Sequence, residues 1–301
     1  MIDIIIPAYN AHKYIKKALI SISMQTISDK VNVYVVNDCS KKNYDEIIKI
    51  FKDKINIKEI KLKKNVGPGA ARQIGIEKST NEYILFLDSD DILYNIFSLE
   101  KLYKTITSNK ADICIGGILD EDENELNYYN NHMGCLHGKL YRRKIIEKNN
   151  LKFNNSRSSE DNSFNRLFLM SNPKITFLDE CVYLYRYNKN SQSKKYTGAK
   201  YIKDYILNME WVVEQAKQRK YNKKQIAELI FSTISYIYSI YVNNQELDNI
   251  NVIFDMSKKL IKLYDEYNGI LSNEEYKFLY DEFEKHNIPK ISLNEFINSC
   301  R

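Results

Sequence analysis

The chain has 301 residues, of which 44% are hydrophobic, and it carries a formal net charge of +6 at pH 7. This hydrophobic fraction is ample for a core of that size, so disorder of the whole chain is excluded. Lys and Arg are interleaved with Asp and Glu without a long basic block, so we expect no nucleic-acid partner. The five cysteines show no CxxC spacing, which indicates reduced thiols and not a disulfide framework or a zinc site.

The N-terminal sequence "MIDIIIPAYN" enters an apolar strand at once and lacks the basic start and the cleavage site of a signal peptide. No apolar run approaches the ~20 residues that span a bilayer. We therefore expect a soluble cytoplasmic protein, with the inner face of the membrane as an alternative location.

Short apolar segments alternate with amphipathic helical patterns in the first half of the chain. The alternation predicts a mostly parallel sheet covered by helices on both faces, which is an α/β fold. The expected strands are "IDIIIP" (2–7), "VNVYVVND" (31–38), "INIKEIKL" (55–62), "EYILFLD" (82–88) and "ADICIGG" (111–117). The expected helices cover 12–24, 44–53, a segment that starts near Gly69, and 98–109.

The second half changes character twice. From about residue 121 to 193 the pattern is mixed and rich in loops, and from about 199 it is helical to the end. We place the boundary near residue 197, which gives an α/β domain over 1–197 and a helical region over 198–301. The apolar stretches at 227–242, 251–267 and 272–286 are best explained by packing against the rest of the chain. A homodimer interface is second, with an acceptor groove or a membrane-surface contact as further alternatives.

Ligands bind beyond the carboxyl ends of the strands in sheets of this kind, which selects residues 7–10, 37–40, 65–72 and 88–91. Pro7 closes the first strand, and Asn10 is expected to cap the next helix. Asp38 suits a hydrogen bond from a base or a ribose, but a turn is an equally good explanation. Arg72 follows a glycine-rich turn that suits phosphate, and a surface arginine at a helix start is its alternative.

The fourth strand end is "FLDSDD", where Asp88 and Asp90 fall on the same side of an extended chain. Two converging carboxylates suit a hard divalent ion such as Mg²⁺ or Mn²⁺. The alternative is that residues 89–91 cap the following helix. For Asp91 we prefer that alternative, or a role in supporting the other two acids.

Taken together and in this order, these segments resemble the inverting, DXD-containing family 2 glycosyltransferases, which have the Rossmann-like GT-A fold. The resemblance covers roughly residues 1–193. It is carried by "IIIPAYNAHKYIKKALISISMQT", "VVNDCS", "NVGPGAARQIGI", "FLDSDD" and "EDNSF".

The resemblance implies a role for each matching position at the donor. It implies that Asp38 contacts the base and Arg72 lies near the nucleotide. Asp88, with Ser89, would meet the ribose or metal side, and Asp90 would bind the Mn²⁺ or Mg²⁺ that bridges the diphosphate. Pro7, Ala8 and Tyr9 would line the base pocket.

The resemblance also places the catalytic base in "SRSSEDNSF", where we choose Asp161. Glu160 would bind acceptor or donor hydroxyls. Attack from the side opposite the leaving group would invert the anomeric centre. From the residues alone, an acidic pair at the start of a helix over 162–170 is the preferred explanation.

Two later segments give weaker expectations. In "HGKLYRRKII", His137 or Lys139 would approach the donor phosphates or sugar, and a helix start with solvated Arg142 and Arg143 is at least as well supported. In "YLYRYNKNSQS", many members of the family place a His two residues after the Arg, where this chain has Asn188. An amide oxygen can bind Mg²⁺ or Mn²⁺, so Asn188 is a weaker candidate metal ligand.

The expected function is transfer of a sugar from a nucleoside-diphosphate sugar, with UDP favoured, to a glycan, lipid-linked or protein acceptor. Bacterial surface glycan or glycoprotein synthesis is the expected setting. Haloacid-dehalogenase-like phosphatases also place Asp-x-Asp after an apolar strand, with Asp88 as nucleophile and Asp90 as acid/base. They rank lower because four sheet-like units precede Asp88 here and no convincing GDxxxD follows it. A non-catalytic sugar-nucleotide-binding protein is the remaining alternative.

Overall fold

The computed structural model describes residues 1–123, 125–189, 191, 198–243, 250–267, 269–271, 295, 297–298 and 301. The chain divides into two compact units, Met1–Lys189 and Asn190–Arg301. Each unit is described by itself. The side chains of residues 198–199, 241–243 and 250–256 are not described.

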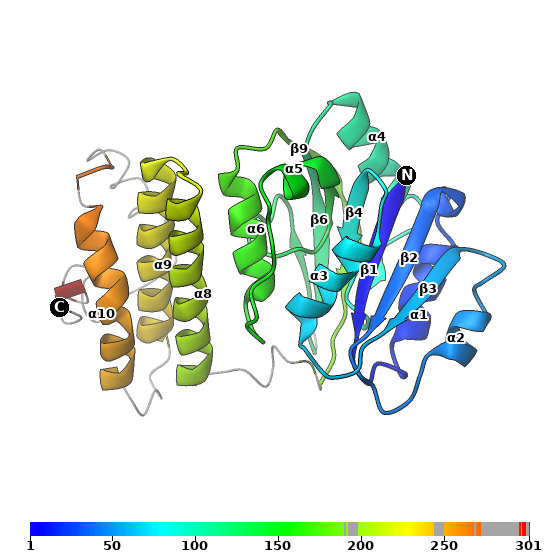
Figure 1. Ribbon diagram of the computed structural model, residues 1–301, viewed down its shortest axis with the longest axis horizontal. Coiled ribbons are helices and arrows are strands. Elements are labelled where there is room, and N and C mark those ends of the chain that lie inside the picture. The colour runs from blue at the N-terminus through cyan, green and yellow to red at the C-terminus, as the bar shows by residue number, and fades with distance from the viewer. Residues whose placement is uncertain are drawn as a thin grey trace. The chain divides into compact units, whose positions relative to one another are not determined.

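The first unit is a nine-stranded sheet flanked by helices (Figure 1). Its strands are β1 Ile2–Ala8, β2 Val31–Asn37, β3 Asn56–Lys61, β4 Tyr83–Phe86, β5 Ile92–Leu93, β6 Ile113–Glu121, β7 Leu126–Tyr129, β8 Lys139–Arg142 and β9 Ile175–Tyr185. Its helices are α1 Ile15–Ser23, the 3₁₀ helix η1 Ser28–Lys30, α2 Asp45–Lys49, α3 Pro68–Lys78, α4 Ser98–Ser108, α5 Arg143–Lys148 and α6 Glu160–Met170.

The strand order is β3-β2-β1-β4-β8-β6-β9-β5, and β7 pairs with β6. Strands β1 to β4 are parallel, with Ile4 opposite both Val33 and Leu85. Strand β8 runs antiparallel between β4 and β6, whereas β6 and β9 are parallel. The predicted α/β fold with a mostly parallel sheet is confirmed.

Both faces of β1 are buried, as its apolar sequence predicts. Ile4 and Ile6 join a core with α1 and α4, and Ile5 faces α3 on the other side. Helix α3 approaches so closely at Gly75 that a Cβ there would lie 2.4 Å from Cγ2 of Ile5. Figure 1 shows α3, α5 and α6 on one side of the sheet and α1 and α2 on the other.

Two local expectations are wrong. Helix α1 begins at Ile15, and Asn10 does not cap it, because Asn10 has a φ of 53° and accepts a hydrogen bond from Lys41 N at 3.0 Å. Arg143 is not solvated, since it is buried with its guanidinium 3.0 Å from Asp3.

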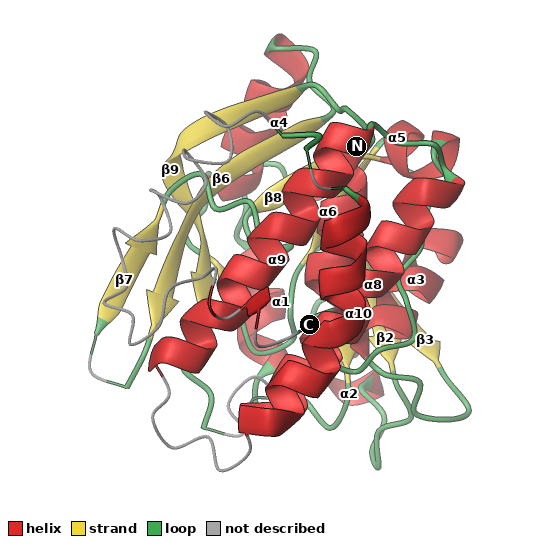
Figure 2. Ribbon diagram, turned by 90° about the vertical axis from the view of Figure 1, so that its left-hand side faces the viewer, coloured by secondary structure: helices red, strands yellow, loops and turns green. Residues whose placement is uncertain are grey.

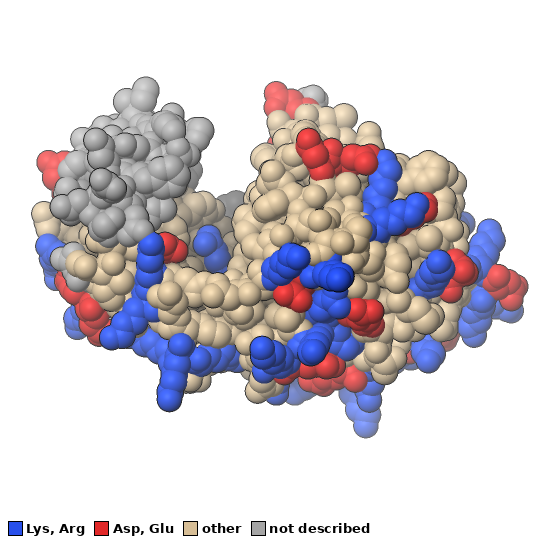
Figure 3. All heavy atoms as spheres, turned by 90° about the horizontal axis from the view of Figure 1, so that it is seen from above, with Lys and Arg blue, Asp and Glu red and all other residues tan. Residues whose placement is uncertain are grey.

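The second unit is helical, with α8 Gly198–Gln218, α9 Lys223–Asn243 and α10 Ile250–Glu266. Buried side chains such as Met209, Ile234 and Leu260 come from all three helices. The predicted stretches 227–242 and 251–267 correspond to α9 and α10, whereas 272–286 lies outside the described residues. None of the described helices combines the length and the apolar character that a bilayer-spanning segment needs. On the face drawn in Figure 3, basic side chains lie among acidic ones.

Candidate active site

Asp38 at the end of β2 is buried and holds the loop that enters α3. Its two carboxylate oxygens accept hydrogen bonds from Val66 N at 2.7 Å and Gly67 N at 2.9 Å. Gly67 has a φ of +91°, a conformation that side chains other than glycine rarely adopt. The carboxylate therefore accepts hydrogen bonds from two backbone N–H groups just before the N-terminus of α3. The predicted base contact would use the remaining lone pairs of the same oxygens.

The residues predicted to line the base pocket lie beside Asp38. Pro7 and Ala8 pair with Val36 and Asn37 across β1 and β2, and Ala8 O accepts a hydrogen bond from Asp38 N at 2.9 Å. Tyr9 follows with half of its surface exposed. The structure therefore brings these three residues and Asp38 to one corner of the sheet edge.

Arg72 is a buried link between two acidic segments. Its Nη2 lies 2.6 Å from Oδ1 of Asp88, and its Nη1 lies 2.7 Å from Oε1 of Glu160. Burial alone would lower the pKa of Arg72, but Asp88 and Glu160 outweigh burial and raise it. The alternative of a surface arginine is wrong, because only 4% of Arg72 is exposed.

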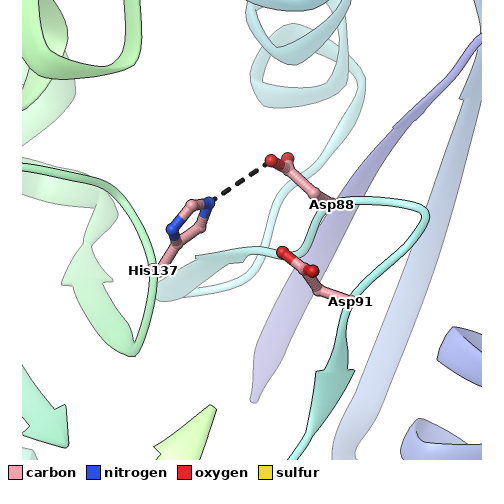
Figure 4. A group of neighbouring side chains, drawn as sticks. All are labelled: Asp88, Asp91 and His137. Carbon is pink, nitrogen blue, oxygen red and sulfur yellow. Dashed lines mark hydrogen bonds and ion pairs between the residues drawn. The ribbon is translucent and has the colours of Figure 1, made fainter. Parts of the chain in front are cut away.

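Asp88 also contacts His137, which lies two residues before the start of β8 (Figure 4). Its Oδ2 lies 3.3 Å from Nε2 of His137, whose ring stacks on Tyr183 with 4.9 Å between the ring centroids. Burial works to raise the pKa of Asp88, but Arg72 and His137 together hold that pKa well below its usual range. The structure thus places His137, a predicted sugar or phosphate contact, directly against the strand end.

Asp91 is an internal support and does not cap a helix, so that expectation is wrong. Tyr183 donates its hydroxyl to Oδ2 at 2.6 Å, and Arg186 donates its backbone N–H to Oδ1 at 2.9 Å. Strand β5 follows Asp91, and α4 begins only at Ser98. Burial raises the pKa of Asp91, and the neighbouring Asp88 and Asp90 add to the rise although His137 opposes it.

The two residues predicted to bind the metal directly are in contact. Asn188 donates from Nδ2 to Oδ2 of Asp90 at 2.7 Å. Burial raises the pKa of Asp90, and the negative charge of Asp88 adds to that effect. Ser89 lies half-buried between the two acids. This strand end therefore concentrates negative charge that its protein neighbours offset only in part.

A divalent cation fits this donor set. Asp88, Asp91 and His137 each offer one ligand atom, and these atoms all lie within 4.8 Å of one another (Figure 4). Burial and, after it, the neighbouring carboxylates raise the pKa of Asp90 and of Asp91, and a cation bound nearby would lower both pKa values. Carboxylate oxygens suit Mg²⁺ or Mn²⁺, and the imidazole suits Mn²⁺ better than Mg²⁺.

The acidic pair predicted to supply the base lies at the start of α6. Ser159 has a φ of 59°, which turns the chain so that Glu160 and Asp161 occupy the first turn. Burial raises the pKa of Glu160 to about 7, and Arg72 opposes the rise. Burial also raises the pKa of Asp161, while Arg72 and His137 oppose it. The predicted base and the "FLDSDD" strand end therefore share Arg72.

Lys139 is the first residue of β8. It is fully buried, and its Nζ donates to the carbonyl of Cys135 at 2.5 Å. Burial lowers the pKa of Lys139, while the negative charge of Asp161 opposes that effect. Lys139 therefore supports the loop ahead of β8. Its contact with the donor phosphates or sugar stays a prediction.

No role was predicted for Tyr183, Arg186 or Cys135. Tyr183 and Arg186 belong to the segment "YLYRY". Its run of aromatic residues around an arginine was the feature from which a site role could have been predicted. Cys135 had no such signal, although its Sγ lies 3.3 Å from Nδ1 of His132. Four cysteines in the described part of the chain, Cys135 among them, are free thiols.

Comparison with known proteins identifies relatives of this arrangement. The model of glycosyl transferase family 2 matches residues 3–171. Glycosyltransferase GlyA of Streptococcus pneumoniae serotype 4 is 29% identical over 65% of this chain and 32% of GlyA. The poly(ribitol-phosphate) beta-N-acetylglucosaminyltransferase TarS of Staphylococcus aureus is 26% identical over 61% of this chain and 35% of TarS. The aligned parts thus span about a third of each of these relatives.

Two solved structures share the fold. Staphylococcus aureus TarS 1-349 in complex with UDP-GlcNAc has a TM-score of 0.77 at 18% identity, over 99% of this chain and 90% of that one. Mannosyltransferase PcManGT from Pyrobaculum calidifontis, in complex with GDP-Man and Mn²⁺, has a TM-score of 0.59 at 12% identity, over 99% and 85%. The predicted GT-A architecture with C-terminal helices is confirmed.

Proposed function

Because the chain belongs to glycosyl transferase family 2, we propose that it moves a sugar from a nucleoside-diphosphate sugar to an acceptor hydroxyl. The observation that carries this proposal is the Arg72 link, which joins the Asp88 strand end to the Glu160–Asp161 turn. UDP is the favoured nucleotide, supported by the UDP-GlcNAc complex of TarS. The setting that we propose is bacterial surface glycan or glycoprotein synthesis, and the name of TarS, a poly(ribitol-phosphate) beta-N-acetylglucosaminyltransferase, is compatible with a glycan acceptor.

Family membership also bears on the phosphatase alternative. A phosphatase would need a free carboxylate of Asp88 as nucleophile, whereas its oxygens contact Arg72 and His137. The family match therefore removes the phosphatase alternative.

In the proposed donor complex, Pro7, Ala8 and Tyr9 line the base pocket and Asp38 accepts from the base. The exposed ring of Tyr9 supports this placement, because an aromatic face can cover a base. Asp88 and Ser89 lie on the ribose side of the metal. Arg72 positions Asp88 and Glu160, because its buried guanidinium contacts both carboxylates.

We assign the divalent ion, Mn²⁺ or Mg²⁺, to Asp90 and Asp88 with His137 beside them. Asp88 and His137 belong to the group whose ligand atoms lie within 4.8 Å of one another, and Asp90 joins them by our proposal. Asn188 orients Asp90 or adds its amide oxygen. When bound, such an ion neutralises the charge that develops on the leaving diphosphate. Asp91 keeps the strand end in place through Tyr183 and Arg186. The Mn²⁺ of the PcManGT structure supports the choice of ion.

Asp161 is the proposed general base. Burial raises its pKa, which makes it a stronger proton acceptor than a solvated aspartate. It takes the proton of the acceptor hydroxyl as that oxygen attacks the anomeric carbon from the side opposite the diphosphate, so the anomeric centre inverts. Glu160, held by Arg72 in the first turn of α6, is proposed to bind an acceptor or donor hydroxyl.

We further propose that residues 1–197 act as the catalytic domain of a cytoplasmic protein. In the helical region, the described helices α8, α9 and α10 pack against one another through their buried faces. A homodimer and a contact with the inner membrane face are secondary proposals for this region.

Replacement of Asp161 by Asn tests the proposed function. UDP-GlcNAc binding in the presence of Mn²⁺ should persist, because the amide keeps the shape of the side chain. Transfer should fall about 10²- to 10⁴-fold, the range for removal of a general base. Isothermal titration measures donor binding, and transfer is followed with acceptors presented as an array.

Asp45→Asn is the matched control, because Asp45 also lies in the first turn of a helix, but in the exposed α2. It should behave as the unmodified protein. Normal transfer by Asp161→Asn would refute the assignment of the base.

A further inference from the structure

Strands β6, β7 and β9 lie side by side at one end of the sheet (Figure 2). Their register fixes which side chains share a face, because paired residues point to the same side and alternate residues along a strand share it. Ile118 of β6 pairs with Tyr129 of β7 and Tyr183 of β9. Two residues further along β6, the next pairs on that face are Asp120 with Asn127 and with Tyr185.

This face leads directly out of the candidate active site. The ring of His137 stacks on Tyr183 and is tilted against Tyr185, with 5.2 Å between the latter centroids. His137 in turn contacts Asp88. The row that contains Ile118 therefore borders the metal ligands, and the row that contains Asp120 lies one step further out.

The strand order gives this face a place in the reaction, which rests on the proposed function. Along the sheet edge the nucleotide residue Asp38 lies on β2, the Asp88 strand end on β4, and then come β8, β6 and β9. The diphosphate leaves on the β2 and β4 side of the sugar. An acceptor that attacks from the opposite side then has to approach over β6 and β9.

The side chains on the face match a ligand rich in hydroxyl groups. Tyr129 offers an aromatic ring that is 44% exposed. Asp120 and Asn127 are half-buried and carry a carboxylate and an amide, the groups that accept from and donate to hydroxyls. The opposite face of β7 differs, because it carries Leu126 and Tyr128, and Tyr128 covers Gly117 so closely that a Cβ there would meet its hydroxyl at 2.4 Å.

We propose that Tyr129, Asn127, Asp120 and Tyr185 form the acceptor face, which binds a polyhydroxylated chain and delivers its terminal hydroxyl past His137 to Asp161. Both a saccharide chain and a chain of alditol phosphates have this chemistry. The aromatic rings take the apolar side of the chain, and the carboxylate and amide take its hydroxyls.

The test measures binding of two probes to the full chain loaded with UDP and Mn²⁺. One probe is an N-acetylglucosamine-terminated oligosaccharide and the other is an oligomer of ribitol phosphate. Ligand-observed NMR gives the Kd of each probe for the unmodified protein and for Tyr129→Ala and Asn127→Ala. Leu126→Ala is the matched control, because it removes a more exposed side chain (63%) from the other face of the same strand.

We expect at least one probe to bind, with a Kd that rises about fivefold or more in Tyr129→Ala, the scale of one aromatic contact. The same Kd should change less than about twofold in Leu126→Ala. The probe affected identifies the source of the acceptor. Binding of neither probe, equal binding by Tyr129→Ala, or an equal loss in Leu126→Ala would overturn the acceptor face. Failure of the proposed function would show separately, as absence of UDP-GlcNAc binding by the unmodified protein.

Discussion

Arg72 is the residue on which the two acidic parts of the site depend. Its planar guanidinium presents parallel donors, so one side chain can hold Asp88 and Glu160 at 2.6 and 2.7 Å at the same time. A buried charge without its partners is costly, so the three groups stabilise one another only as a set. The position of Asp161, next to Glu160 in the same helical turn, therefore depends on Arg72 as well.

Replacement of Arg72 by Lys should damage both stability and transfer. A lysine keeps the charge but presents one compact ammonium, so one of the two carboxylates loses its partner in a buried place. We expect the free energy of unfolding to fall by roughly 3–5 kcal/mol, and transfer to fall more than UDP-GlcNAc binding. Urea denaturation and initial transfer rates measure the two effects.

The control for this substitution is Arg219→Lys, at a half-buried arginine that contacts the Gln215 side chain of its own helical segment. It should leave both quantities nearly unchanged. Equal stability of Arg72→Lys and the unmodified protein would contradict the view that Arg72 links the acidic segments.

At this scale the sequence predicted which residues gather, but not how they pair. Asp38, Arg72, Asp88 and Asp90 were selected because they follow strands or a glycine-rich turn, and all lie at one sheet edge. The burial of Arg72 could not be predicted, because Glu160 is 88 residues away in sequence. The expectation that Asp91 caps the following helix was mistaken for the same reason, since Tyr183 reaches it from β9.

Among the elements, β1, the turn before β4 and α5 are joined by a buried ion pair away from the site. Asp3 on β1 accepts hydrogen bonds from the backbone of Thr80 and Asn81 at 2.8 and 2.6 Å. Arg143 lies 3.0 Å from the same carboxylate and also donates to the carbonyls of Asn81 and Ile76. The ion pair of Asp3 and Arg143 thus fixes the beginning of β1 and the turn before β4. The carboxyl ends of these strands carry residues of the site.

Replacement of Arg143 by Met should remove about 3–5 kcal/mol from the free energy of unfolding, because it leaves Asp3 charged and buried. Donor binding by the folded fraction should persist, since Arg143 does not contact the site residues. Chemical denaturation followed by circular dichroism measures the change.

Lys104→Met breaks a solvent-exposed pair with Glu100 and serves as the control, for which we expect little change in the denaturation midpoint. A small effect of Arg143→Met, similar to that of Lys104→Met, would contradict the structural role of the buried pair.

The long apolar strands and helices could be predicted from the sequence, whereas the short or polar ones could not. β1, β2 and β4 are apolar on both faces and α4 has a regular amphipathic pattern, so both types were recognised. β5 has only two residues, and β7 lies in a polar segment and gains its place by pairing with β6. The start of α1 was misplaced because Asn10 bonds to Lys41 in the neighbouring loop.

At the scale of the whole molecule, buried tyrosines make the fold sensitive to high pH. The chain contains 24 tyrosines, and burial raises the pKa of Tyr83 to about 12 and that of Tyr141 well above its usual value. The neutral phenol is favoured in the folded state. The stability that this provides is fully present below the unfolded pKa near 10 and is lost as the pH rises through the folded pKa.

An alkaline titration followed at 295 nm should therefore show two stages. Tyrosines that are exposed to solvent should ionise reversibly near pH 10. Tyr83 and Tyr141 should ionise only at higher pH, together with loss of near-UV circular dichroism. A single stage near pH 10 without unfolding would contradict the burial of these rings.

The central claim is that one end of the sheet binds a nucleoside-diphosphate sugar together with a divalent ion held by Asp90. The most direct measurement is a thermal-shift series with UDP-GlcNAc, with and without Mn²⁺, on the unmodified chain and on Asp90→Ala. A ligand that binds only the folded state at 100 times its Kd adds about 2.7 kcal/mol, which corresponds to a shift of several degrees. We predict that shift for the unmodified chain with Mn²⁺ and the loss of its Mn²⁺-dependent part in Asp90→Ala. No stabilisation of the unmodified chain by UDP-, GDP-, CMP- or dTDP-sugars in the presence of Mn²⁺, or an equal response of Asp90→Ala, would contradict the claim.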